Sequence, residues 1–152
     1  MSLTRLVRLG SGAVVAVALA LFLAPNAAAA APPVKIVKVQ YDSPGADRGG
    51  NTSINAEYVI IKNVSTRTQT LTGWTLRDKQ NHVYKFPRFT LGAGKSVVVR
   101  SGKGTVTAAT RYFNSASYIW NNTGDTAYLR TASGAALSSC GWTSLGRGYK
   151  SC

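Results

Sequence analysis

The chain has 152 residues, 45% of them hydrophobic, and it carries 18 Lys and Arg against 5 Asp and Glu, which gives a formal net charge of +13. Once an N-terminal leader is set aside, roughly 120 residues remain, which is enough for one domain with a hydrophobic core and too few for two of ordinary size. No stretch after the leader is apolar enough to span a bilayer.

The first thirty residues have the layout of a secretory signal peptide. Arg5 and Arg8 precede an apolar run from Ala13 to Ala24, and an alanine tract follows from Ala27 to Ala31. The apolar run is shorter than the roughly 20 residues that a membrane-spanning helix needs, and small residues follow it, as at a signal peptidase site. We therefore expect a cleaved signal peptide over residues 1–31 and a secreted protein that is extracellular or associated with the cell wall.

Cleavage would leave one domain, residues 32–152, with a strong excess of positive charge. It removes Arg5 and Arg8, so 16 basic residues (18 minus 2) remain against 5 acidic ones. A field of this sign favours anionic partners such as nucleic acid, anionic cell-wall polymers or an acidic membrane surface. A second interpretation is that the charges serve only solubility, because no run of adjacent Lys or Arg occurs in the mature chain.

Short apolar or alternating segments, separated by turn residues, predict β-strands throughout the domain, and no ten-residue stretch has an apolar stripe at helical spacing. Strands are predicted at Val34–Tyr41, Glu57–Asn63, Leu71–Leu76, Val83–Phe86, Ser96–Arg100, Tyr118–Trp120, Thr126–Arg130 and Ala135–Cys140. The segment from Asp42 to Ser53 is predicted to be a loop. The continuous apolar centre of Glu57–Asn63 indicates a central position in a sheet. The pattern predicts an all-β, antiparallel two-sheet sandwich.

Three tryptophans lie in this domain. Trp74 and Trp120 stand among Thr, Leu, Ile and Tyr, so we expect both to fill the core between the sheets, with stacking on a sugar as the alternative. Trp142 lies between Gly141 and Thr143 near the C-terminus, and it is the tryptophan that we expect to be partly exposed.

Cys140 and Cys152 are the only two cysteines. In an exported protein they predict a disulfide. Closing so short a loop would stabilise the fold by about 3 kcal/mol in the chain-entropy description, and it would hold down a glycine-rich tail. A reactive thiol or a metal pair is the alternative, but two cysteines without His or acidic ligands cannot complete a zinc site.

The acidic residues and the single histidine offer little for catalysis or metal binding. Asn122–Asp125 is predicted to be a turn, and a calcium role for Asp125 with Asp42 and Asp47 is the alternative. Glu57 is predicted to be a partnered acid at a strand end rather than an active carboxylate. We therefore expect no catalytic residue, no metal and no cofactor.

Five blocks of residues, in this order and spacing, carry a resemblance to a known family. They are Ser43–Asp47, Glu57–Asn63, Leu71–Asp78, Thr90–Val97 and Trp120–Asp125. Over Val34 to Trp142 the sequence resembles the lamin tail domain family. The resemblance implies an immunoglobulin-like antiparallel β-sandwich, with its motif positions serving the fold. These positions are Glu57, Asn63, Gly73, Trp74, Asp78, Trp120, Asn122, Gly124 and Asp125.

The chain is similar to the exported bacterial members of that family. In them the module often accompanies nucleases, phosphatases and other extracellular hydrolases, and this sequence has no such neighbour. We therefore expect a stand-alone member. The sequence departs from the usual pattern at Thr131, where an acidic residue is common, and it adds the tail that ends in Cys152.

A fold of this kind hosts unrelated activities, so the function has to be argued from the residues. We expect a non-catalytic binding or adhesion module that engages an anionic extracellular polymer, either a cell-wall polymer or nucleic acid, through basic residues on consecutive hairpins. These candidate contacts are Lys79, Lys85, Arg88, Lys95, Arg100 and Lys103. One alternative is a small extracellular hydrolase that uses Asp42, Asp47, Glu57 or Asp125. Another is a module that binds a protein partner at an exposed sheet edge. The sequence predicts no oligomeric state.

Overall fold

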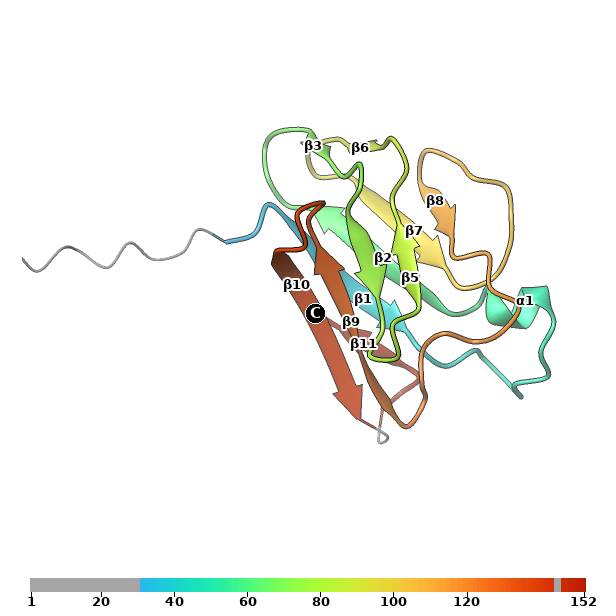
Figure 1. Cartoon of the computed structure of the whole chain (residues 1–152). Helices are drawn as coiled ribbons and strands as arrows, with labels where there is room; N and C mark the ends of the chain where they lie inside the picture. The colour runs from blue at the N-terminus through green and yellow to red at the C-terminus, as the bar shows by residue number, and fades with distance from the viewer. Residues whose placement is uncertain (1–30, 144–145) are drawn as a thin grey trace, which may run out of the picture. The chain divides into compact units, whose positions relative to one another are not determined.

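Two β-sheets pack face to face in the part of the chain that the computed structural model describes, residues 31–143 and 146–152 (Figure 1). The elements are β1 (Val34–Gln40), α1 (Asn51–Ile54), β2 (Tyr58–Asn63), β3 (Gln69–Thr70), β4 (Thr75–Arg77), β5 (Val83–Lys85), β6 (Thr90–Leu91), β7 (Ser96–Arg100), β8 (Thr110–Tyr112), β9 (Gly124–Arg130), β10 (Ala136–Thr143) and β11 (Tyr149–Ser151). One sheet has five strands in the order β11–β1–β2–β7–β8, and the other has four in the order β10–β9–β4–β5. The short strands β3 and β6 pair with each other. The all-β, immunoglobulin-like sandwich is confirmed.

The predicted signal peptide falls outside the described residues, apart from Ala31. Within the described ranges, no helix is both long enough and apolar enough to pass through a membrane. The helix α1 is only four residues long. Its first three residues lie in the segment, Asp42 to Ser53, that was predicted to be a loop.

Strand β2 is the middle strand of the five-stranded sheet, as its apolar run predicted. It pairs antiparallel with β1 on one side and with β7 on the other. Val59 and Ile61 are buried, whereas Tyr58, Ile60 and Lys62 alternate with them on the opposite side of the strand. The same alternation in β7 buries its second and fourth residues. The edge strand β8 differs from the others because it pairs with β7 in parallel.

The hydrophobic core is built from the inward residues of both sheets. Its members include Val39, Val59, Ile61, Leu76, Phe86, Val97, Val99, Trp120, Ala127, Leu129 and Trp142. Trp120 is 2% exposed, and its ring lies edge-on to the rings of Phe113 and Trp142. Aromatic rings in this geometry add to the stabilisation that buried area provides.

The prediction for Trp142 was wrong. Its side chain is only 8% exposed, because Tyr41 stacks on it with ring centroids 4.8 Å apart. Its indole Nε1 donates to the carbonyl oxygen of Asn121 at 2.8 Å. Trp74, which was expected in the core, is only partly buried and packs against the edge of the core. The small neighbours of Trp142 concealed the inward alternation of β10, in which Cys140 and Trp142 both point to the core.

Two further predictions of secondary structure were wrong. Leu71–Leu76 is not one strand, because the chain turns at Gly73, whose φ of 80° suits a residue without a Cβ. Tyr118–Trp120 is irregular, and one of its backbone amides donates to Glu57 instead of to a neighbouring strand. The strands β8 and β11 were not predicted at all.

The predicted disulfide is present. It joins Cys140, in β10, to Cys152, which follows β11, with the two Cα atoms 6.0 Å apart. Strand β10 is an edge of the four-stranded sheet and β11 is an edge of the five-stranded sheet. The bond therefore links the two sheets along one side of the sandwich, and it holds the tail as an added strand.

Candidate binding face

The outer face of the five-stranded sheet carries a row of aromatic and polar side chains. The strand register places Tyr149, Gln40, Tyr58, Arg100 and Tyr112 beside one another across β11, β1, β2, β7 and β8. Neighbouring strands lie about 4.8 Å apart, so the row is about 19 Å long. Three tyrosines therefore recur on every second strand across the full width of the sheet.

Lys38 and Arg100 lie between the tyrosine rings. Nζ of Lys38 lies 4.7 Å from the ring centroid of Tyr149 and 5.4 Å from that of Tyr58, and it also donates to the Tyr58 hydroxyl at 3.1 Å. The guanidinium carbon of Arg100 lies 5.5 Å from the Tyr58 centroid, and Nη1 donates to the carbonyl oxygen of Asn55 at 2.5 Å. Cations at these distances are attracted to aromatic rings, so the contacts order both partners in the absence of a ligand.

Two more lysines and two apolar residues complete the surface. Lys35 and Lys62 are paired across β1 and β2, and Ile60 and Val98 are half-buried neighbours on β2 and β7. None of the five described strands contains Asp or Glu. We call this surface the tyrosine–cation face. It comprises Lys35, Lys38, Gln40, Tyr58, Ile60, Lys62, Val98, Arg100, Tyr112 and Tyr149.

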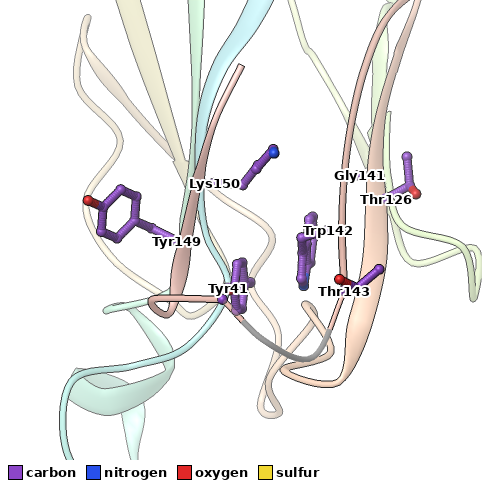
Figure 2. Close-up of a pocket in the computed structure, with 8 residues that line it drawn as sticks. Tyr41, Thr126, Gly141, Trp142, Thr143, Tyr149 and Lys150 are labelled. Carbon is purple, nitrogen blue, oxygen red and sulfur yellow. The ribbon is translucent and has the colours of Figure 1, made fainter.

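A groove of about 540 Å³ lies where β10 and β11 approach each other (Figure 2). The stacked rings of Tyr41 and Trp142 line it, together with Lys150. Figure 2 shows that Tyr149 points away from Trp142, to the other side of β11. This orientation agrees with the strand register, which places Tyr149 on the tyrosine–cation face. The groove itself offers little aromatic surface, because Trp142 is almost fully buried.

The acidic side chains lie elsewhere. Three are at most 1% exposed: Glu57, Asp78 and Asp125. The other two, Asp42 and Asp47, meet at Asn122, whose Nδ2 donates to one oxygen of each at 3.0 and 3.2 Å. The only ion pair among the described residues joins His82 to Asp78, so no Lys or Arg there is paired with a carboxylate. In the same residues, no three His, Cys, Asp or Glu side chains are grouped so that they could hold a metal ion.

Glu57 lies directly behind the tyrosine–cation face, one residue before β2. Burial raises its pKa from 4.5 to about 7, and the hydrogen bond that Oε2 accepts from the backbone amide of Ile119, at 2.9 Å, opposes part of that rise. A raised carboxyl pKa is common in catalytic acids. At 1% exposure, however, the Glu57 carboxyl group is out of reach of a substrate.

Asp78 and Asp125 hold two turns together at one end of the four-stranded sheet. Asp78 accepts hydrogen bonds from the backbone amide and from Nδ1 of His82, at 2.7 and 2.5 Å. Asp125 accepts from three backbone amides, one of them that of Lys79 in the β4–β5 turn. The amide orientation that satisfies Gln80 lets it donate to both carboxylates, at 3.1 and 3.2 Å. Buried carboxylates with this many partners serve the fold.

The sequence profile of one protein family, described as Lamin Tail Domain, matches residues 27–144, which is well over half of the chain. The chain belongs to the lamin tail domain family. A comparison with curated proteins gave no match. Family membership agrees with the sandwich fold, and it leaves the ligand of this lamin tail domain to be inferred from its surface.

Other motif positions of this lamin tail domain make local contacts within the fold. Asn63 is fully buried, and its Nδ2 donates to the carbonyl oxygens of Leu91 and Gly92 at 2.9 and 3.0 Å. These bonds tie the end of β2 to the β6–β7 turn. Gly73 and Gly124 adopt φ angles of 80° and 132°, which side chains disfavour.

The lamin tail domain does not bring the six predicted polyanion contacts together on one face. Arg100 lies on the tyrosine–cation face, whereas Lys85 lies in β5 of the four-stranded sheet. The other four lie in connections between strands: Lys79, Arg88, Lys95 and Lys103. Lys85 and Arg100 are separated for a topological reason, because β5 and β7 are close in sequence but belong to different sheets.

Sequence reasoning missed most of the tyrosine–cation face. Period-2 alternation in the predicted strands places Lys38 or Tyr58 on one side of its own strand, but it gives no register between strands. Tyr112 and Tyr149 belong to β8 and β11, which are three residues long and carry no apolar pattern strong enough to predict them.

Proposed function

We propose that this protein is an exported, non-catalytic binding module that engages an anionic extracellular polymer through the tyrosine–cation face. The observation that carries the proposal is a face with four cations and three tyrosines. Among the described residues, no Lys or Arg is paired with a carboxylate. Cations without such partners keep their charge available to a ligand. A polyanion that neutralises them releases its counterions, which favours binding.

The tyrosine row supports a polymer with rings as well as charges. Lys38 lies between the rings of Tyr149 and Tyr58, and Arg100 is placed between Tyr58 and Tyr112 by the register. A chain that crosses the strands would meet rings and cations in turn. Aromatic side chains interleaved with basic ones are the arrangement by which proteins bind single-stranded polyanions, and each ring–base stack is worth about 1–3 kcal/mol.

Two observations support export. The disulfide between Cys140 and Cys152 is of a kind that persists in oxidising compartments. The leader, with Arg5 and Arg8 before its apolar run, has the layout of a signal peptide.

The carboxylates fit a binding role better than hydrolysis. Glu57 and Asp125 are buried and bonded to backbone amides. Asp42 and Asp47 are the described carboxylates that a substrate can reach, and the side-chain amide of Asn122 engages both. A two-carboxylate hydrolase needs both groups to flank an accessible bond. No observation among the described residues favours such a pair.

Titration of the purified, disulfide-bonded protein with single-stranded DNA and with poly(glycerol phosphate), at low and at physiological salt, tests the proposal. We expect binding at low salt that weakens as salt rises. If all four cations of the face contact phosphates, the slope of log K against log salt for DNA is about −3, since each contact contributes about −0.7 on a single strand. Dextran, a neutral glycan, is the control and should not bind. Absence of binding to both polyanions at low salt would overturn the proposal.

A further inference from the structure

A buried arginine without a counter-ion lies at the edge of the five-stranded sheet that is farthest from β11. Arg111, in β8, is 8% exposed and points to the core side of the strand, opposite to Thr110 and Tyr112. Its guanidinium carbon lies 4.1 Å from the ring centroid of Phe89. Among the described residues, no carboxylate pairs with it.

The fold satisfies only part of this guanidinium. Nη1 donates to the carbonyl oxygen of Thr107 and, at 3.0 Å, to that of Thr110. Nε of Arg111 is buried, and no acceptor in the described chain lies within hydrogen-bonding distance of it. A guanidinium carries five N–H donors, and a buried charge is costly unless it is paired and hydrogen-bonded. The other terminal nitrogen, Nη2, is not among the buried atoms and donates no hydrogen bond within the described chain, so Arg111 retains capacity for an anionic acceptor there.

A cavity of about 480 Å³ adjoins Arg111. Arg88, an exposed residue of the β5–β6 connection, lines the same cavity and brings a second positive charge. Thr90 contributes a neutral hydroxyl group, and Phe89 and Ala108 form the apolar part of the lining. The cavity is open to solvent, so it leaves room for the group that carries the anion.

We propose that this cavity binds a tetrahedral oxyanion, phosphate or sulfate, either as the free ion or as the ester group of a larger molecule. Arg111 is the deep contact and Arg88 is the outer one. Two guanidinium groups match a multiply charged oxyanion better than they match a single carboxylate, because they bring two positive charges and the exposed Arg88 can donate two parallel hydrogen bonds. The site lies on the inner side of β8, away from the tyrosine–cation face, so it does not depend on polymer binding there.

Thermal unfolding in different anions tests the proposal. The disulfide-bonded protein is unfolded in phosphate, sulfate, glycerol phosphate and acetate, with chloride as the reference at the same pH and ionic strength. We expect phosphate and sulfate to raise Tm in a saturable manner, and acetate to behave like chloride. A larger shift with glycerol phosphate than with phosphate would identify an ester ligand, and equal shifts would identify the free ion. No shift above chloride, or an equal shift with acetate, would overturn the proposal.

Variants locate the effect. Arg88→Ala removes an exposed side chain and should weaken the apparent phosphate affinity about tenfold, roughly the value of one hydrogen bond to a charged group. Lys95→Ala removes the same charge from the exposed β6–β7 turn, and it should respond to phosphate like the wild type. Equal responses of these two variants would contradict the site.

Arg111 is tested by two substitutions. Arg111→Lys keeps the charge but loses the guanidinium donors and their fixed geometry, so it should weaken phosphate binding about tenfold. Should the lysine variant not fold, Arg111→Met removes the buried charge at similar length, a change that folds tolerate. The methionine variant should fold and lose the phosphate-dependent rise in Tm. A methionine variant that retains the full rise would overturn the proposal.

Discussion

The two outer faces of the sandwich are both basic, and they differ in what lies between the charges. The five-stranded face presents Lys35, Lys38, Lys62 and Arg100, and the four-stranded face presents Arg77, Lys85 and Arg130. On the first face, tyrosines recur on every second strand. On the second, Tyr128 is the one outward tyrosine, 5.8 Å from the guanidinium of Arg77. Apart from Arg77 and Arg130, its outward neighbours on β4, β9 and β10 are small: Thr75, Thr126, Ser139 and Gly141.

This difference separates two explanations of polymer binding. If charge alone attracts the polymer, the two faces should contribute almost equally, because their cation numbers are similar. If the tyrosines also contact the polymer, the five-stranded face should dominate, since each stacked ring adds about 1–3 kcal/mol. Single-residue variants on the two faces therefore distinguish the two explanations.

Removal of the disulfide should have the largest effect, because it acts on the strand that carries Tyr149. Replacing Cys140 and Cys152 by Ser should cost about 3 kcal/mol in the free energy of unfolding, as judged by urea titration. We expect β11 to detach from β1 and polymer affinity to fall with it. Tyr149→Ala in the disulfide-bonded protein is the control, and it should lower affinity without lowering stability. Full polymer affinity in the serine variant would show that β11 does not contribute to the binding face.

Glu57→Gln should separate stability from binding, because Glu57 lies on the inner side of the same sheet. Its folded pKa of about 7 exceeds the reference value of 4.5, so the folded state keeps a proton that the unfolded state releases between these values. The stability that this proton provides is full below pH 4.5 and is lost as pH rises through 7, a change of about 3 kcal/mol.

The Gln variant should therefore lack this pH dependence and exceed the wild type above pH 7 by up to about 3 kcal/mol, with unchanged polymer affinity. Urea titrations from pH 4.5 to 8 measure the effect. Asp47→Asn, at an exposed carboxylate, should follow the wild-type curve. Parallel curves for the wild type and Glu57→Gln would show that burial of Glu57 does not shift its titration.

Tyr58→Ala and Tyr128→Ala compare one ring from each face. Tyr58 contacts both Lys38 and Arg100, so its removal loses a stacking surface and the order of two cations. Polymer affinity should fall about tenfold for Tyr58→Ala and less than about twofold for Tyr128→Ala. Equal losses, measured by fluorescence titration, would favour an explanation from charge alone.

Single lysine changes should have the smallest effect. Lys62→Ala, on the five-stranded face, should reduce the slope of log K against log salt for single-stranded DNA by about 0.7. Lys85→Ala, on the four-stranded face, removes the same charge and should leave the slope unchanged. A change in slope for Lys85→Ala and none for Lys62→Ala would show that the polymer binds the four-stranded sheet instead.

The sequence predicted the fold but did not predict the tyrosine–cation face. The blocks around Trp74 and Trp120 identified the sandwich, because turn residues and strand alternation are local signals. The face depends on register between distant strands, and Tyr58 lies in one row with Tyr149 and Tyr112 only after five strands have paired. The burial of Trp142 was missed for a similar reason, since its stacking partner, Tyr41, lies at the other end of the domain sequence.

The six basic residues chosen from sequence show the same limit. Proximity along the chain placed Lys85 and Arg100 in one group, and the sandwich assigns them to different sheets. Lys38, which contacts two of the tyrosines, lies in the first strand and far from that group in sequence. Charge composition predicted the sign of the partner's charge. The order of the strands in the sheets was needed to locate the proposed binding surface.

Two charge-matched triple variants, compared in the same titration against single-stranded DNA and poly(glycerol phosphate), test whether the tyrosine–cation face is the binding site. One carries Lys35→Gln, Lys38→Gln and Lys62→Gln, and the other carries Arg77→Gln, Lys85→Gln and Arg130→Gln. Both lose three positive charges, so their overall fields change alike. We predict that the first loses most of its affinity and salt dependence while the second stays close to the wild type, whereas equal losses in both would contradict the tyrosine–cation face as the binding site.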